Sequence, residues 1–194
     1  MLLAEPPTAF HATVSPVTPT ELRHTYRAGC PVPPAQLRTI RLTYWGFDNR
    51  PHEGALIIRD RVATDVVTVF RRLYIARFPI RRMRLMSAYR GSDDASMAAD
   101  NTSAFNCRFV KGTRRWSMHA YGEAIDVNTI ENPYVQGSRV LPPSGRRYLD
   151  RSNSRPGMAV EGGVLVRAFD AVGWHWGGRW AASKDYQHFS TTGR

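Results

Sequence analysis

Two short segments of the chain carry residue types that bind metal ions. Residues 117–126 contain His119 and Asp126, and a segment near the end of the chain contains Asp185 and His188. A catalytic zinc ion keeps three protein ligands, drawn from His, Cys and carboxylate side chains, and leaves a fourth position open. His119, Asp126 and His188 would supply that set, and Asp185 would remain close by as a free carboxylate.

Asp126 also admits a purely structural interpretation. Apolar residues flank it on both sides, so the carboxylate should be partly buried, and binding a metal ion is one way to offset the cost of burial. A lone His and Asp at this spacing are more often a structural pair, but the second segment favours a metal site. Asp185 and His188 would point to opposite faces of a regular strand. We therefore expect Asp185 to sit in the turn before the strand, or on a bulge, so that it faces the same metal ion.

The elements that must position these residues follow from the hydrophobic pattern. Strands are expected where polar and apolar residues alternate or where short apolar runs are bounded by turn residues, at 39–45, 55–58, 83–86, 122–130 and 186–189. Helices are expected at 62–73, with Asp60 as the N-cap, and at 164–172. The long polar stretches 87–115 and 132–157 should be loops, and loops of this length are usually functional. The order of elements predicts a mixed α+β domain.

The length of 194 residues fits one domain. Residues 1–20 are rich in Pro, Thr and Ala and have no apolar period, so they should form a flexible tail ahead of a domain that covers 21–194. No apolar run approaches the roughly 20 residues of a membrane-spanning helix. The first residues lack the basic and apolar regions of a secretory signal.

The net charge of +11 comes almost entirely from arginine. Such a field attracts polyanions, whether nucleic acid, anionic membrane or the phosphate-rich and carboxylate-rich bacterial wall. A GC-rich genome would explain the preference for arginine over lysine equally well. The sequence has no zinc-finger, helix-turn-helix or RNA-binding signature, so specific nucleic-acid binding is not expected.

The two cysteines, Cys30 and Cys107, are far apart in the sequence and form no CxxC pair. An exported protein would pair them, whereas a cytosolic protein would keep two thiols. We expect a disulfide, which would stabilise the fold by roughly 3–4 kcal/mol because it closes a long loop.

The two metal-binding segments together resemble a known group of enzymes. Residues 117–126 follow the pattern Ser-x-His-x-x-Gly-x-Ala-x-Asp, which is similar to the signature of the VanY-like D-alanyl-D-alanine carboxypeptidases. Residues 173–189, with Gly-Trp-x-Trp-Gly-Gly-x-Trp followed by Asp-x-x-His-Phe, resemble the second metal motif of that family. The family belongs to a superfamily with VanX-type dipeptidases, L-alanyl-D-glutamate endolysins and the hedgehog domain. The resemblance implies a small central antiparallel sheet with flanking helices.

The resemblance also implies a role for particular residues. His119, Asp126 and His188 match the zinc ligands, and Asp185 matches the general base. An arginine that stabilises the developing oxyanion usually precedes the first motif. Arg108 and Arg90 are both candidates, with a preference for Arg108, and a surface or salt-bridged role is the alternative for each. The residues expected to contact the substrate are Ser117, Tyr121, Trp174 and Trp176, although packing in the core is the alternative for each aromatic ring.

These roles predict a monomeric zinc peptidase that hydrolyses peptidoglycan stem peptides, most simply a D-alanyl-D-alanine carboxypeptidase. The zinc ion would lower the pKa of water from about 15.7 towards 7, and Asp185 would accept the proton. An L-alanyl-D-glutamate endopeptidase and a non-catalytic zinc domain that binds the wall are the alternatives. A wall substrate implies export, with a signal peptide that this sequence does not contain.

Overall fold

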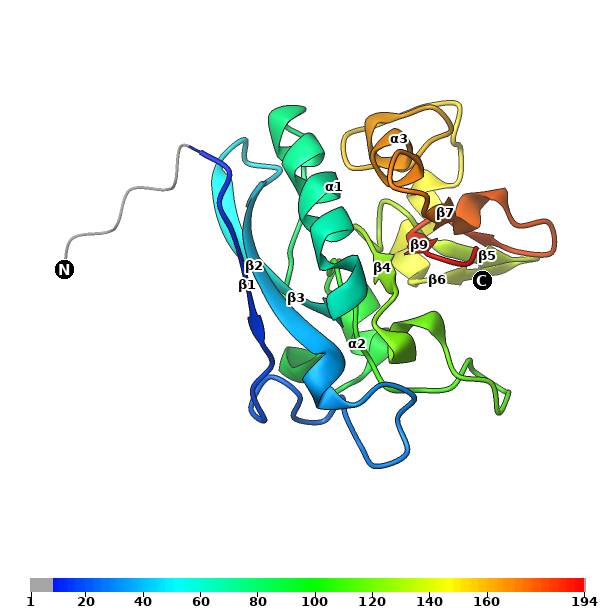
Figure 1. The fold of residues 1–194 in the computed structure, drawn as a ribbon. Coiled ribbons are helices and arrows are strands. Elements are labelled where there is room, and N and C mark those ends of the chain that lie inside the picture. Colours follow the sequence, from blue (N-terminus) through cyan, green and yellow to red (C-terminus); the bar gives the residue numbers. More distant parts are fainter. Residues whose placement is uncertain (1–8, 194) are drawn as a thin grey trace.

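The computed structural model describes residues 9–193 and confirms the α+β class (Figure 1). The described residues form three separate three-stranded sheets rather than one central sheet. The α-helices are α1 (Ala63–Ile75), α2 (Asp93–Ala98) and α3 (Val164–Asp170). Short 3-10 helices cover Pro34–Gln36, Asp60–Val62, Met86–Tyr89, Met118–Tyr121, Pro143–Tyr148 and Gly177–Arg179. None of the helices within residues 9–193 is long and apolar enough to cross a membrane.

The first sheet is antiparallel and has the order β1-β2-β3, from β1 (Ala12–Pro16), β2 (Leu37–Trp45) and β3 (Pro51–Arg59). The strands expected at 39–45 and 55–58 are confirmed and are longer than predicted. The flexible tail expected over 1–20 is wrong for β1, which pairs with β2 along its whole length. Residues 1–8 of that predicted tail lie outside the described residues.

Helix α1 packs on this sheet and joins it to the rest of the domain (Figure 1). Its buried face, including Val66, Phe70 and Leu73, shares a core with apolar residues of β2 and β3. The prediction that Asp60 caps this helix is wrong. A 3-10 turn over Asp60–Val62 precedes α1, and the Asp60 carboxylate accepts a hydrogen bond from the Arg61 backbone at 2.7 Å.

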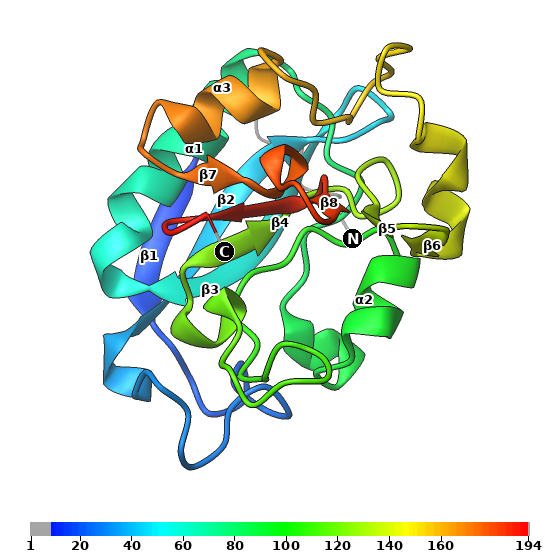
Figure 2. The ribbon, with the colours of Figure 1, turned by 90° about the vertical axis from the view of Figure 1, so that its right-hand side faces the viewer.

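The second sheet has the order β4-β9-β7, from β4 (Ala124–Asp126), β9 (His188–Ser190) and β7 (His175–Trp176) (Figure 2). All of its pairs are antiparallel, and Asp126 lies directly opposite His188. Helix α3 covers this sheet, with the Phe169 ring stacked on Phe189 at a centroid distance of 4.1 Å. The strands expected at 122–130 and 186–189 and the helix expected at 164–172 are confirmed. β4 and α3 are shorter than expected, and β9 begins two residues later.

The third sheet has the order β6-β5-β8, from β5 (Tyr134–Gln136), β6 (Arg139–Leu141) and β8 (Lys184–Asp185) (Figure 2). It lies partly within the stretch expected to be a loop, 132–157. Its strands have only two or three residues, which is too short for a hydrophobic period to be visible in the sequence.

The polar stretch that precedes the first metal motif is ordered by hydrogen bonds rather than by a strand. The strand expected at 83–86 is wrong, because Met83 makes one isolated bridge to Thr102 and a 3-10 helix starts at Met86. The buried side chain of Asn101 accepts a hydrogen bond from the Arg84 backbone at 2.9 Å and donates one back at 3.0 Å. These bonds fix the chain just before Ser103, which forms an isolated bridge to Asp126.

Cys30 and Cys107 form a disulfide, as expected. It adjoins a second apolar cluster that includes Leu37 and Phe105. Its neighbour Asn106 donates a backbone hydrogen bond to the His119 carbonyl at 3.2 Å. The disulfide therefore fixes the strip of chain that lies against His119.

Candidate metal centre and its cleft

The three predicted zinc ligands meet at one point. His119, Asp126 and His188 each offer a ligand atom, and these atoms all lie within 4.8 Å of one another. His119 Nε2 lies 3.2 Å from Asp126 Oδ2, and His188 Nδ1 lies 3.2 Å from Asp126 Oδ1. The antiparallel pairing of β4 with β9 creates this arrangement, because it places Asp126 opposite His188.

His119 is oriented by the 3-10 helix Met118–Tyr121. Ser117 occupies the N-cap, and its hydroxyl accepts a hydrogen bond from the His119 backbone at 3.3 Å. His119 Nδ1 lies 2.6 Å from the Ala104 carbonyl, to which it donates. That bond leaves Nε2 as the ring nitrogen that faces Asp126, and histidines that bind metals are usually oriented by such a bond from their other nitrogen.

Gly122 ends this 3-10 helix in a conformation that only glycine adopts easily. Its φ is +67°, and a Cβ there would lie 2.7 Å from the Arg59 backbone nitrogen. The Arg59 nitrogen donates to the Gly122 carbonyl at 2.8 Å. The glycine thus lets the turn that carries His119 rest directly on the end of β3.

The charge of Asp126 is stabilised by its neighbours. Burial raises the pKa of this carboxyl, but the two imidazoles, His119 first and His188 second, outweigh burial and hold the pKa well below its usual range. The carboxylate is therefore ionised and available as a ligand at neutral pH.

The donor set fits zinc. Two nitrogen ligands and one oxygen ligand are a common combination in catalytic zinc sites. One ligand atom from each of the three residues lies within 4.8 Å of the other two, so a single ion can contact all three. His119 and His188 are buried, and both line the cleft. A substrate would therefore reach these residues through the cleft.

Asp185 lies beside the metal ligands, at the end of β8. Asp185 therefore lies in a strand rather than in the turn itself, and a two-residue turn follows it and leads into β9. The Trp176 indole nitrogen donates to the Tyr186 carbonyl at 2.8 Å and holds this turn. Gly177 packs so closely that a Cβ would lie 2.6 Å from the Asp185 carbonyl oxygen.

The environment of Asp185 suits a proton acceptor. Burial, supported by the negative charge of Asp126, raises the pKa of Asp185 to about 6, although His188 and His119 act in the opposite direction. Its Oδ1 atom is buried and accepts no hydrogen bond from residues 9–193. A general base works best with a pKa near the operating pH.

These groups lie in a cleft of about 1110 Å³. The predicted substrate contacts Ser117 and Tyr121 line it, together with Asp185. Its apolar and aromatic walls include Trp116, Met118, Tyr134, Leu141 and Trp180. The volume slightly exceeds the usual range for small-molecule sites, roughly 300–1,000 Å³, so the cleft accommodates more than a dipeptide.

The two candidate oxyanion arginines are separated by the structure. Arg108 lines the cleft and forms an ion pair with Asp93. Arg90 is exposed at the end of the 3-10 helix Met86–Tyr89 and does not line the cleft. Of the two candidates, therefore, only Arg108 lines the cleft that contains His119, Asp126 and His188.

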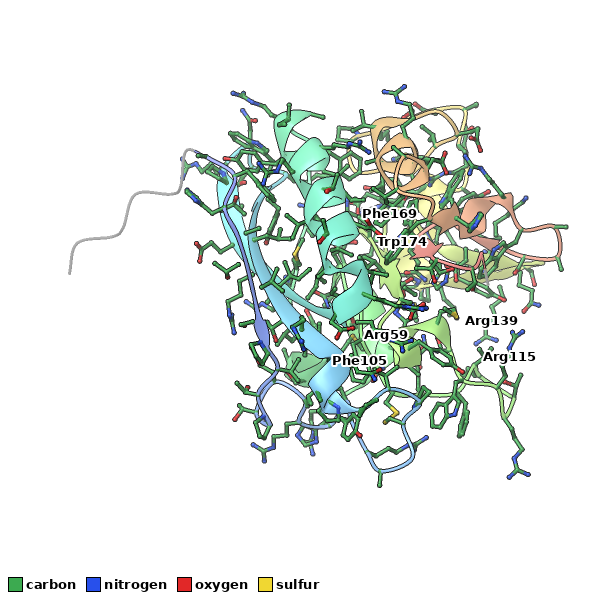
Figure 3. The ribbon with its side chains drawn as sticks, in the orientation of Figure 1. Arg59, Phe105, Arg115, Arg139, Phe169 and Trp174 are labelled. Atoms are coloured by element: carbon green, nitrogen blue, oxygen red, sulfur yellow. A yellow bond between two sulfur atoms is a disulfide. The ribbon has the colours of Figure 1, made fainter. Side chains whose placement is uncertain are left out.

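Two of the predicted substrate contacts are wrong. Trp174 and Trp176 are 2% and 5% exposed, belong to the main core and do not line the cleft. Trp174 packs against Phe169 of α3, and Figure 3 shows both side chains in the interior beside β7. Trp180 lines the cleft instead, with its ring 5.4 Å from that of His188.

A buried carboxylate that the sequence did not single out supports the floor of the cleft. Glu123 is 1% exposed and accepts hydrogen bonds from Arg59 at 2.9 Å and from Arg61 at 2.8 and 2.6 Å. Thr191 donates a further bond at 3.0 Å. Burial raises the pKa of Glu123, but the bonds from Arg61, Arg59 and Thr191 outweigh it and lower the pKa overall. Its place two residues after the His-containing turn, just before an apolar strand, is the signal that could have identified it.

Comparison with known proteins gives one match. Residues 111–191 match a family model described as D-alanyl-D-alanine carboxypeptidase. Neither the curated proteins nor the solved structures contain a match to the chain. The matched segment holds His119, Asp126, Asp185 and His188, and it excludes Arg108 and Arg90. The resemblance drawn from the two motifs is thus confirmed, and it extends over residues 111–191, which are similar to the D-alanyl-D-alanine carboxypeptidase family.

Proposed function

We propose that this protein is a zinc peptidase that removes the terminal D-alanine from peptidoglycan stem peptides. One observation carries the proposal: within the segment that matches the peptidase family, His119, Asp126 and His188 converge at the floor of a cleft with Asp185 beside them. The pairing of the two motifs through β4 and β9 also supports the finer proposal of a fold like that of the hedgehog domain and the D-Ala-D-Ala peptidases.

The three ligands would hold zinc through His119 Nε2, His188 Nδ1 and the Asp126 carboxylate. The bound ion would act as a Lewis acid towards the scissile carbonyl and would make water a stronger acid. Asp185 would accept a proton from the attacking water and return it to the leaving amine. The position of Asp185 supports this role, because it lines the same cleft as the three ligands and its buried Oδ1 atom accepts no hydrogen bond from residues 9–193.

We propose Arg108 as the group that stabilises the developing oxyanion. It lines the cleft, and its ion pair with Asp93 at the start of α2 restricts its orientation. Removing one stabiliser of this kind commonly costs roughly 3–4 kcal/mol in the transition state. Ser117 and Tyr121 are proposed as substrate contacts, since both line the same cleft.

The experiment that tests this function compares two variants with the wild type. Asp185→Ala should keep one zinc ion per chain and lose release of D-alanine from a wall pentapeptide, whereas His119→Ala should lose both zinc and activity. Full activity in either variant would reject the assignment. Zinc binding by the wild type without release of any product would favour the non-catalytic alternative, and release of L-alanine would favour the endopeptidase.

We propose that the protein acts outside the cytoplasm as a monomer. The Cys30–Cys107 disulfide supports export, because such bonds persist in oxidising compartments. Detection of two free thiols in the unfolded, unreduced protein from its natural source would contradict export. Light scattering at assay concentration should give the mass of one chain.

A further inference from the structure

Cations line the cleft in two groups that differ in their partners. Arg59 and Arg61 pair with Glu123, and Arg108 pairs with Asp93, so the charges of these arginines are compensated. The second group, Lys111, Arg115 and Arg139, lines the same cleft and makes no ion pair with residues 9–193. Outside the metal centre, the one cleft carboxylate that lacks an ion pair within the described chain is Asp94. The cleft therefore presents an excess of uncompensated positive charge.

The unpaired cations stand on two hairpins. Lys111 and Arg115 belong to the hairpin 109–116, whose base is closed by the bridge between Phe109 and Trp116 and by the stacking of their rings at 4.0 Å. Arg139 begins β6 in the β5–β6 hairpin. All three side chains are exposed, and Figure 3 shows Arg115 and Arg139 on the same outer side of the molecule.

The register of the third sheet gives the distance between Arg139 and the reacting centre. Tyr134 of β5 pairs with Asp185 on one side and with Leu141 on the other, and Gln136 pairs with Arg139. Arg139 is thus two strands across and two residues along from Asp185, a backbone separation of roughly 12 Å at normal strand spacing and rise. An extended peptide covers that distance in about three or four residues, and in fewer when the arginine side chain reaches inward.

We propose that Arg115 and Arg139 form a second recognition point, which binds a substrate carboxylate about two to four residues before the scissile bond. This inference rests on the proposed function, because removal of a terminal residue leaves only the amino side of the substrate to extend along the cleft. Guanidinium groups bind carboxylates with paired, charge-assisted hydrogen bonds. In a wall pentapeptide, L-Ala-γ-D-Glu-L-Lys-D-Ala-D-Ala, the free α-carboxylate of D-Glu lies at this position. The site therefore selects stem peptides in which that group is a carboxylate rather than an amide.

The test compares this pentapeptide with the same peptide carrying a carboxamide at that one position. Both keep the terminal D-Ala-D-Ala, so the chemistry at the metal is the same. The wild type should show a KM about tenfold lower for the carboxylate peptide, as expected for one charge-assisted contact. In Arg115→Gln and in Arg139→Gln, the KM for the carboxylate peptide should rise towards that for the carboxamide peptide.

Arg114→Gln is the matched control. Arg114 is the exposed neighbour of Arg115 on the same hairpin but does not line the cleft. This variant removes the same charge from the same hairpin and should keep the wild-type preference. Two results would overturn the inference and leave the proposed function intact. The first is a wild type that cleaves both peptides equally well, and the second is an unchanged preference for the carboxylate peptide in both Arg115→Gln and Arg139→Gln. If Arg114→Gln lost the preference for the carboxylate peptide as fully as the two cleft variants, the inference would also fail, and general attraction by net charge would explain the preference. If neither peptide is cleaved by zinc-loaded wild type, the proposed function itself fails and takes this inference with it.

Discussion

Replacement of Glu123 by glutamine tests whether a buried ion cluster holds the floor of the cleft. The amide keeps the shape of the side chain but loses its charge, and its NH₂ group would face guanidinium donors from Arg59 and Arg61. Breaking a fully buried ion pair typically costs 3–5 kcal/mol. Arg59 and Arg61 are 25% and 60% exposed, so water can solvate them after the change. We therefore expect Glu123→Gln to lower the free energy of unfolding by about 2–3 kcal/mol at pH 7.

The effect should depend on pH in a defined direction. The pKa of Glu123 is lowered in the folded protein, so its charge contributes stability that is present above the ordinary pKa of 4.5 and is lost as the pH falls through the folded value. Urea unfolding of wild type and variant at pH 7, and again below pH 4.5, measures this. The difference between the two proteins should shrink at the lower pH. A difference below about 0.5 kcal/mol at pH 7, or one that stays constant with pH, would refute the reasoning.

Three further changes test other parts of the account. The double variant Cys30→Ser with Cys107→Ser should lower the free energy of unfolding by about 4 kcal/mol, because the bond spans 77 residues; urea denaturation with and without reductant checks this, and a wild type insensitive to reductant would contradict it. Gly122→Ala should lower stability by at least about 1 kcal/mol, because its φ is +67° and the added Cβ would meet the backbone of β3; an unchanged unfolding midpoint would be inconsistent with the described turn. Trp174→Ala should cost about 3–5 kcal/mol of stability, whereas Trp180→Ala should chiefly raise KM, and the reverse pattern would show that the cleft has been misplaced.

The cluster of His119, Asp126 and His188 was predictable because each of these residues lies within a short motif whose chemistry is visible locally. His119 and Asp126 are close in sequence, and Asp185 and His188 are three residues apart. Their joint convergence required only that the two motifs lie on adjacent strands, and β4 and β9 do so. The long strands and helix α1 were predictable for the same reason, since each shows its period within one segment.

What could not be predicted depends on contacts between distant segments. Whether Trp174 or Trp180 faces the cleft depends on the packing of α3, because both rings lie in the same aromatic run. The ion cluster around Glu123 joins it to arginines more than 60 positions earlier. β1 is a short, mostly exposed segment without a clear hydrophobic period, and it is a strand because it pairs with the edge of β2.

The central claim is that catalysis depends on a zinc ion held by His119, Asp126 and His188. Titration of zinc into metal-free protein, with release of D-alanine from the wall pentapeptide as the readout, tests it most directly. The account predicts that activity rises in proportion to added zinc and reaches its maximum at one ion per chain. Full release of D-alanine without metal, or none after one equivalent of zinc has bound, would contradict it.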